Sequence, residues 1–366
     1  MPVVPAAPFP ETLYFSLTVN GTAFPYATYG VLRASVNGSR TFSCKFQSKE
    51  ALELCGIGAT VEVNIGRGNL TNLIDDRKFI GIIKDLEPKE NGSFTAYDYT
   101  TFLAESQFVH YKAQDYVGQD LYFAAANACN YKGIDVSRLT QGTGLFITED
   151  MNLFGWKTRK EFIDACFDEM KFVVNDNRHP TNTIKQWQYA IRSGKVMDFF
   201  LPDEDNTITH PHVVLSLNNN NILDEDIVSS IDTTRLINAI TVVSTTDKNI
   251  YAQLEDLGSQ KKYGVRGSFV SYPSTNKLFL EEVAYKVLNR FKEPTVSYAF
   301  SVTNSDNLDL GDLVSIDMPS LPKEVTKTII EYELELSETM ALRCKIGMPE
   351  LTTKDYMDLL IKPTNR

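Results

Sequence analysis

The feature that most constrains the fold of this chain is the alternation of apolar and polar residues at a spacing of two. Residues 13–19 alternate in this way, as in a strand with one buried face. Asn37-Gly38 and Asn91-Gly92 each separate two further alternating runs. Asn and Gly tolerate positive φ, so each dipeptide predicts the turn of a β-hairpin. Residues 1–100 are therefore predicted to form an antiparallel β domain.

The pattern changes over residues 101–228, where helical and strand spacings are mixed. Asp115 is the predicted N-cap of a helix that continues to about residue 128. Thr158 and Glu161 have the spacing of a capping box and are followed by apolar residues at helical spacing. These signals predict a mixed α/β insert domain.

Strand patterns return over residues 229–348, which we predict to be a second β domain with one packed helix near 276–291. Residues 349–366 are predicted to be a C-terminal tail. The expected fold class is thus α+β, mainly β. Two antiparallel β domains, each resembling a small barrel or sandwich, flank a mixed α/β middle domain.

A row of glutamates marks the predicted strand over residues 326–336. Alternation places Glu331, Glu333 and Glu335 on one face and apolar residues on the other. On the next strand Arg343 and Lys345 also point outward. If the two strands form a hairpin, these opposite charges can pair across it.

Composition excludes several classes of protein. The chain has 366 residues, of which 43% are hydrophobic and 23% charged, which is ordinary for a globular protein of two or three domains. No apolar run is long enough to span a bilayer, and the N-terminus predicts no cleaved signal peptide. The net charge of −11 argues against general affinity for nucleic acid.

The sequence gives only weak evidence for a metal or redox site. The five cysteines are scattered and form no CxxC pair, so they are predicted to be buried thiols of a chain made in a reducing cytoplasm. His210-Pro211-His212 places two imidazoles on one side of an extended segment, but no third ligand has a recognisable spacing. A loop entering a strand is the favoured interpretation, and no metal or cofactor is expected.

No catalytic pattern is found in the sequence. A Gly-x-Ser-x-Gly elbow does not occur, and both Gly66-Arg67-Gly68 and Gly142-Thr143-Gly144 lack the Lys-Ser/Thr of a phosphate loop. Paired carboxylates are expected in solvated loops, although a cell-envelope glycan or peptidoglycan hydrolase stays open as an alternative. A second alternative is a carbohydrate- or receptor-binding module that uses Trp156 or Trp187, of which Trp187 is expected in the core.

Five short signals follow one another in a fixed order within residues 10–348. They are Phe79–Lys84 running into Tyr97–Leu103, Gln114–Ile134, Asp232–Val242, Tyr263-Gly264 with the helix at 276–291, and Leu310–Val314. In this order they resemble bacteriophage tail baseplate hub proteins, the late control protein D-like central hubs of contractile tails and related injection systems. No single signal is specific, and the resemblance rests on their order.

The resemblance implies a non-enzymatic structural protein with two tube-like β-barrel domains per chain, so that a homotrimer matches a sixfold tail tube. The implied partners are the tail tube or distal tail protein, the central spike protein, baseplate wedge proteins and the tape measure protein. The implied location is the tail baseplate of a virion, after synthesis in the host cytoplasm. Some relatives carry a fused cell-wall hydrolase or sugar-binding module, which is not expected here. Another tail-tip component, such as a distal tail or tube adaptor protein, is the nearest alternative.

If the chain lines a tube through which DNA passes, its acidic residues have a predicted role in that passage. Carboxylates along the lumen would keep phosphates moving instead of binding them. Glu331, Glu333 and Glu335 are the predicted lumen- or interface-facing residues, and DNA is a partner only in transit.

Overall fold

The computed structural model describes residues 14–67, 74–108, 116–140, 142–147, 157–170, 187–192, 194–201, 212–216, 227–233, 236–272, 274–303, 308–317, 325–336 and 341–347. The chain divides into two compact units. Unit 1 comprises residues 1–170, 186–228 and 298–347, and unit 2 comprises residues 171–185, 229–297 and 348–366.

Among the described residues, unit 1 contains most of the strands and four helices. Its helices are α1 (Lys49–Leu54), α2 (Thr100–Glu105), α3 (Leu121–Cys129) and α4 (Arg159–Met170). Its strands are β1 (Tyr14–Val19), β2 (Thr22–Ala23), β3 (Ala27–Ser35), β4 (Thr41–Phe46), β5 (Thr60–Arg67), β6 (Ile74–Glu87), β7 (Ser93–Asp98), β8 (Gln107–Phe108), β9 (Lys157–Thr158), β10 (Gln188–Ile191), β11 (Met197–Phe200), β12 (His212–Ser216), β18 (Leu313–Asp317), β19 (Val325–Leu336) and β20 (Ala341–Gly347). Two further strands, β13 (Val228–Asp232) and β17 (Thr295–Thr303), cross the sequence boundaries between the units.

Both predicted hairpins of the first hundred residues are confirmed. Strands β3 and β4 pair antiparallel, with Leu32 opposite Phe42, and β6 pairs antiparallel with β7. Asn37, in the first turn, has φ of 57°. Asn is among the few residues that adopt this left-handed conformation readily, which is why the dipeptide marks a turn.

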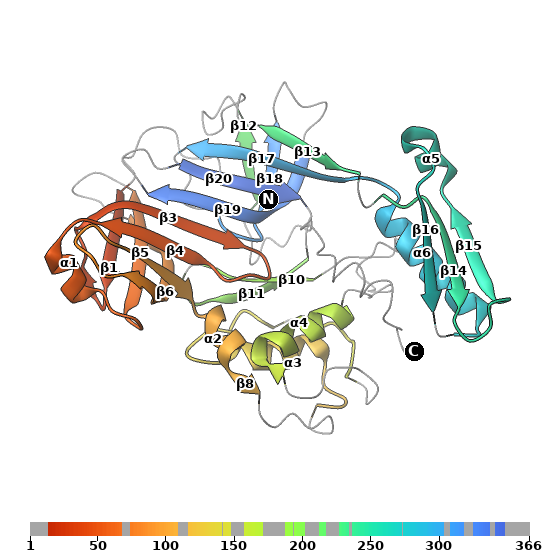
Figure 1. Ribbon diagram of the computed structural model, residues 1–366, viewed down its shortest axis with the longest axis horizontal. Coiled ribbons are helices and arrows are strands. Elements are labelled where there is room, and N and C mark those ends of the chain that lie inside the picture. The colour runs from red at the N-terminus through yellow and green to blue at the C-terminus, as the bar shows by residue number, and fades with distance from the viewer. Residues whose placement is uncertain are drawn as a thin grey trace. The chain divides into compact units, whose positions relative to one another are not determined.

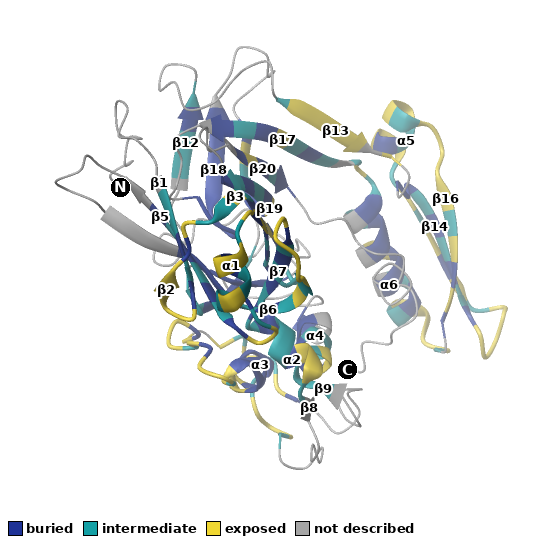
Figure 2. Ribbon diagram, turned by 60° about the vertical axis from the view of Figure 1, so that its left-hand side comes forward, coloured by how far each residue is buried: buried dark blue, intermediate teal, exposed yellow. Residues whose placement is uncertain are grey.

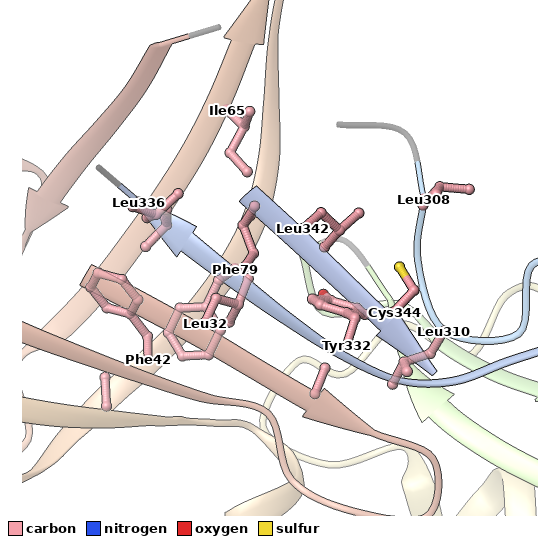
Figure 3. Packing of buried hydrophobic residues seen from close by; sticks show 14 of the residues in the cluster. Leu32, Phe42, Ile65, Phe79, Leu308, Leu310, Tyr332, Leu336, Leu342 and Cys344 are labelled. Atoms are coloured by element: carbon pink, nitrogen blue, oxygen red, sulfur yellow. The ribbon is translucent and has the colours of Figure 1, made fainter. Parts of the chain in front are cut away.

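One sheet joins the N-terminal and C-terminal strands of unit 1. Its strands follow the order β17-β20-β19-β3-β4-β7-β6-β5-β1-β2, so β19 lies directly beside β3 (Figure 1). The two strands are antiparallel, with Tyr332 opposite Ala34 and Leu334 opposite Leu32. Their buried side chains belong to a single apolar cluster, in which Phe42 and Phe79 of the N-terminal strands accompany Tyr332 of β19 (Figure 3). The N-terminal and C-terminal strands of unit 1 therefore share a core.

A parallel pair extends this sheet. β12 runs parallel to β18, with Leu215 opposite Ile316, and β18 pairs antiparallel with β19. Parallel neighbours need a long connection between them. Here nearly a hundred residues separate the two strands, and the pairing was not among the sequence predictions.

Helices α3 and α4 pack together in a second apolar cluster of unit 1. The capping box before α4 is confirmed, since Glu161 N donates to Thr158 Oγ1 at 3.1 Å and Thr158 N donates to Glu161 Oε2 at 2.6 Å. The N-cap of α3 is Asp120 and not the predicted Asp115, which lies outside the described residues. The Asp120 carboxylate accepts hydrogen bonds from both the Tyr122 and Gly144 amides, so it fixes the helix start to the Gly142–Gly144 loop.

Unit 2 is a small α/β unit. It contains β14 (Ala239–Ser244), β15 (Tyr251–Glu255), β16 (Gly267–Tyr272), α5 (Leu257–Tyr263) and α6 (Lys277–Phe291). The strand order is β15-β14-β16, with β14 and β16 parallel. The predicted apolar stripe of α6 is confirmed, because the helix packs against β14 and β15 and the members of the stripe are buried: Leu280, Val283, Ala284, Val287, Leu288 and Phe291. Figure 2 shows buried residues along α6.

The chain is mainly β and contains a large antiparallel sheet, as predicted. Its compact units do not follow the predicted boundaries of 1–100, 101–228 and 229–348, because residues 298–347 belong to unit 1 while residues 229–297 form most of unit 2. The two tube-like barrels and the middle domain stay predictions. Among the described residues, no helix is both long and apolar enough to cross a membrane.

Candidate functional site

The glutamate row lies on the solvent-facing side of the continuous sheet of unit 1. Glu331 is opposite Lys345, and Glu333 is opposite Arg343, so the predicted cross-strand pairing of opposite charges is confirmed. Glu333 also faces Arg33 on β3, on its other side. Arg33 Nε donates to Glu333 Oε2 at 2.7 Å, and Arg343 NH1 lies 3.9 Å from Glu333 Oε1. One carboxylate is thus held between two guanidinium groups.

A shallow hollow of about 350 Å³ lies over this row. Its polar lining comes from three adjacent strands, with Ser301 on β17, Arg343 and Lys345 on β20, and Glu331 and Glu333 on β19. The polar face continues beyond β3, where the hydroxyl groups of Ser43 and Thr95 lie 3.1 Å apart. It therefore spans strands from the N-terminal and C-terminal parts of unit 1.

The acidic row is not a purely negative surface. The predicted partners Arg343 and Lys345 lie on the same face through β20, and β3 adds Arg33 beside Glu333, which was not predicted from the sequence. Exposed ion pairs of this kind add little stability. They do set the local charge, and here the positive and negative side chains nearly balance.

A second candidate site is a buried cluster of charges beneath this face, centred on Arg40. The Arg40 side chain is 1% exposed. Its guanidinium donates to the carbonyl oxygen of Ile191 at 3.2 Å, to that of Lys78 at 2.6 Å, and to the Tyr332 hydroxyl at 2.5 Å. Asp309 Oδ1 lies 4.0 Å from the same guanidinium. Arg40 thus connects four separate stretches of unit 1.

The loop before β18 contributes the acids of this cluster. Asp312 Oδ1 accepts a hydrogen bond from Arg192 NH2 at 2.5 Å, and the Asp309 amide donates to Asp312 Oδ2 at 2.8 Å. Lys78 Nζ donates to the Leu308 carbonyl oxygen at 2.6 Å. Gly311, with φ of 87°, makes the sharp turn that brings both aspartates inward. The motif Leu310–Val314 therefore leads into β18 and also supplies Asp312 to the buried charge cluster.

Charge compensation decides the ionisation of this buried cluster. Burial alone would raise the pKa of Asp309, but Arg40, Lys78 and Arg192 outweigh it and hold the pKa well below its usual range. Burial lowers the pKa of Lys78, and Asp309 offsets this only in part. Burial raises the pKa of Asp98, although Thr100 and Arg40 stabilise its anion. The cluster holds its charges because they neutralise one another.

Sequence reasoning did not identify Arg40, Lys78 or Asp309. The only available signal was Lys78, a cation directly before the apolar run Phe79–Ile83 of a central strand. Buried charges of this kind are rare unless they are paired. The partner of Lys78 lies 230 positions away, so periodicity could not identify it.

Of the other candidate residues from the sequence, Trp187 and His212 lie within the described residues. Trp187 is buried beside Tyr122, with ring centroids 5.5 Å apart, so its predicted core position is confirmed. Trp156 and His210 lie outside the described residues, and His212 is the first residue of β12. The described residues contain no group of three or more His, Cys, Asp or Glu side chains that could hold a metal.

The five cysteines are all free and buried, as predicted. Burial raises the pKa of Cys44 and of Cys344 to about 12. Their thiolate forms are therefore scarce near neutral pH, and reagents that attack thiolates have little access.

We expect native protein to show almost no reaction with a thiol-specific chromogenic reagent near neutral pH, because all five thiols are buried. The same protein unfolded in denaturant should release chromophore for five thiols. Rapid labelling of several thiols in the native protein would contradict the described burial.

The chain has the fold of a phage tail protein. It is similar to the tail protein from Neisseria meningitidis MC58, with a TM-score of 0.62 and 11% identity over 96% of this chain and 99% of that one. It is also similar to the 43 kDa tail protein of prophage MuSo2 from Shewanella oneidensis, with a TM-score of 0.59 and 12% identity over 96% of this chain and 98% of that one.

No protein-family profile and no curated protein matches this sequence. At identities this low, the similarity to the two tail proteins establishes the fold alone. The tail-protein fold that the predicted resemblance implied is confirmed at that level.

Proposed function

We propose that this chain is a non-enzymatic structural hub of a phage tail tip or a related contractile injection machine. Copies of the chain form a ring that joins the tail tube or distal tail protein to the central spike, and DNA passes through the ring. Baseplate wedge and tape measure proteins are the further partners. The fold shared with two tail proteins supports this assignment to a tail.

The observation that carries the proposal is the single sheet that unites strands from both ends of unit 1. One side of this sheet covers an apolar core, and the other side is a broad polar face with near-balanced charges. An extended polar sheet face with near-balanced charges is suited to lining a channel. In the ring, this face is directed toward the lumen.

In this arrangement Glu331, Glu333 and Glu335 act by neutralising basic neighbours. Arg33, Arg343 and Lys345 on the same face would otherwise attract phosphates. With the glutamates present, the face gives passing DNA no net positive surface to bind.

The ring itself is expected to be a homotrimer. Mass photometry of the purified chain at micromolar concentration should give a main species at three times the chain mass of 41.2 kDa. A ring closes through heterologous contacts, in which one surface of a copy meets a different surface of the next. Negative-stain images should then show particles with threefold symmetry and a central hole.

Two outcomes would contradict this expectation in different ways. A main species of six copies would favour a distal tail or tube adaptor protein, which is the nearest alternative. A stable monomer that binds neither tail tube nor spike components would overturn the hub proposal as a whole.

A further inference from the structure

A group of cations and aromatic rings lies on the surface of unit 1, apart from the polar sheet face. The rings are those of Tyr99, Phe102 and Tyr131, and the cations are Lys84, Lys132, Arg159 and Lys195. We call this group the cation–aromatic cluster. Its members come from β6, the N-cap and first turn of α2, the turn after α3, the start of α4 and the turn between β10 and β11.

The rings hold the cations close together. Lys195 Nζ lies 3.6 Å from the centroid of the Tyr99 ring, and that ring lies 5.4 Å from the ring of Phe102. Lys132 Nζ lies 5.9 Å from the Phe102 centroid and 5.8 Å from the Tyr131 centroid. Cations within about 6 Å of a ring centroid are attracted by the negative face of the ring. The rings therefore offset part of the repulsion between neighbouring ammonium groups.

The other two cations extend the cluster on either side. Arg159 stacks over Tyr131 at 4.5 Å from the centroid, and its NH1 donates to the Ala128 carbonyl oxygen at 3.1 Å. Lys84 Nζ lies 5.8 Å from the Phe102 centroid and pairs with Glu105. Each ring thus already has at least one cation of the chain near it.

Within the residues that the structure describes, neither Lys132 nor Lys195 has a carboxylate at ion-pair distance, and Glu105 pairs with Lys84. Asp135 lies close in sequence to Lys132, but its carboxylate accepts a hydrogen bond from the Ser137 amide. The chain as a whole carries a net charge of −11, which makes a positive cluster unusual on its surface.

The backbone at Lys132 is a second, independent observation. Among the described non-glycine residues, three have positive φ, and two of them are Asn20 and Asn37. The third is Lys132, with φ of 54°, which is followed by Gly133 with φ of 78°. Lysine has no intrinsic preference for this conformation, and such outliers concentrate at functional positions. Lys132 is exposed in this turn.

We propose that the cation–aromatic cluster is a docking site for a carboxylate-bearing segment of a protein partner. Charge complementarity favours a partner that carries carboxylates. Lys132 is exposed and Lys195 is half-buried, and neither pairs with a carboxylate among the described residues. Carboxylates form strong charge-assisted hydrogen bonds with such groups. Single-stranded nucleic acid is the less suitable ligand, since it requires aromatic faces on which bases stack. Here those rings hold cations of the chain itself.

The proposal rests on contacts within unit 1 and does not depend on the proposed ring. Its test uses a fluorescent oligo-glutamate of about ten residues at low salt, where charge pairing is least screened. The full-length chain should bind this probe, and Lys132→Gln with Lys195→Gln should weaken binding about tenfold or more. A matched control is Lys261→Gln with Lys262→Gln, which removes two lysines from α5 of unit 2 and should leave binding unchanged.

Three outcomes would overturn the proposal. These are no measurable binding of oligo-glutamate by the native chain, equal loss of binding in the control variant, and tighter binding of an oligothymidylate of similar length than of oligo-glutamate. The last outcome would assign the cluster to nucleic acid. Circular dichroism of each variant should match that of the native chain, since exposed or half-buried lysines contribute little to stability, and the control loses only the exposed ion pair of Lys262 with Glu293.

Discussion

Replacing Arg40 with methionine is expected to destabilise unit 1 by about 3–5 kcal/mol, because removing one member of a buried charge cluster leaves its partners uncompensated. Methionine is a shorter, unbranched side chain that cannot donate a hydrogen bond. The Ile191 and Lys78 carbonyl oxygens and the Tyr332 hydroxyl would each lose a donor, and Asp309 would lose its largest attraction. Urea unfolding followed by tryptophan fluorescence measures the change through Trp187, which lies in unit 1.

The matched control is Arg33→Met on the preceding strand. The Arg33 side chain is 56% exposed and pairs with Glu333 at the surface. Exposed ion pairs contribute about 0–1 kcal/mol, so this variant should unfold close to the native midpoint. If both variants unfold at the same denaturant concentration, Arg40 does not have the structural role described here.

The pH dependence of Arg40→Met has a defined sign. In the native chain the positive charges around Asp309 hold its pKa below the unfolded value, so it contributes stability above about pH 4 that is lost as the pH falls further. Without Arg40, the pKa values of both Asp309 and Asp98 rise. The stability difference between native and variant should therefore shrink as the pH falls from about 6 to 3. A difference that grows in acid would contradict the charge assignments.

The second large effect is expected on the polar sheet face. Replacing Glu331, Glu333 and Glu335 together with glutamine leaves Arg33, Arg343 and Lys345 uncompensated on that face. The variant should gain affinity for duplex DNA, with a slope of log K against log salt of about −2 to −3 for three neutralised phosphates. Native protein should show no such binding. In an assembled tail, genome ejection should slow, since phosphates would then bind during transit.

Charge rescue separates this effect from a loss of folding. Adding Arg33→Gln, Arg343→Gln and Lys345→Gln to the triple variant removes the excess positive charge, and DNA binding should return to the native level. Electrophoretic mobility shift at several salt concentrations measures both variants. If the triple variant binds DNA no better than the native chain and ejects at the native rate, this face does not line the lumen.

Local patterns in the sequence predicted much of the fold. The turns at Asn37-Gly38 and Asn91-Gly92, the capping box of Thr158 and Glu161, and the apolar stripe of α6 are all confirmed. Each depends on residues within a few positions of one another, because turn conformation, capping and amphipathicity are short-range properties. The error at Asp115 has the same origin, since Asp120 is an equally suitable N-cap five residues later.

These short-range patterns could not predict which strands pair when they lie far apart in the sequence. Strand alternation shows which face of β19 is buried, but not that β3, some 300 positions away, is its neighbour. The predicted glutamate row was correct as a row, yet its charge balance depended on Arg33 from that distant strand. Likewise, Arg40 and Asp309 are both ordinary polar residues in the sequence, and only the fold brings them together.

The sequence by itself determined the local elements, the mainly β character and the order of motifs that resembles tail baseplate hub proteins. Those follow from propensity and periodicity, which operate over a few residues. The tertiary structure alone decided which strands adjoin, where the compact units divide, and which charges compensate one another. The physical reason is that cross-strand pairing and charge compensation depend on distance in space, and the same alternating strand can satisfy its backbone hydrogen bonds with many different neighbours.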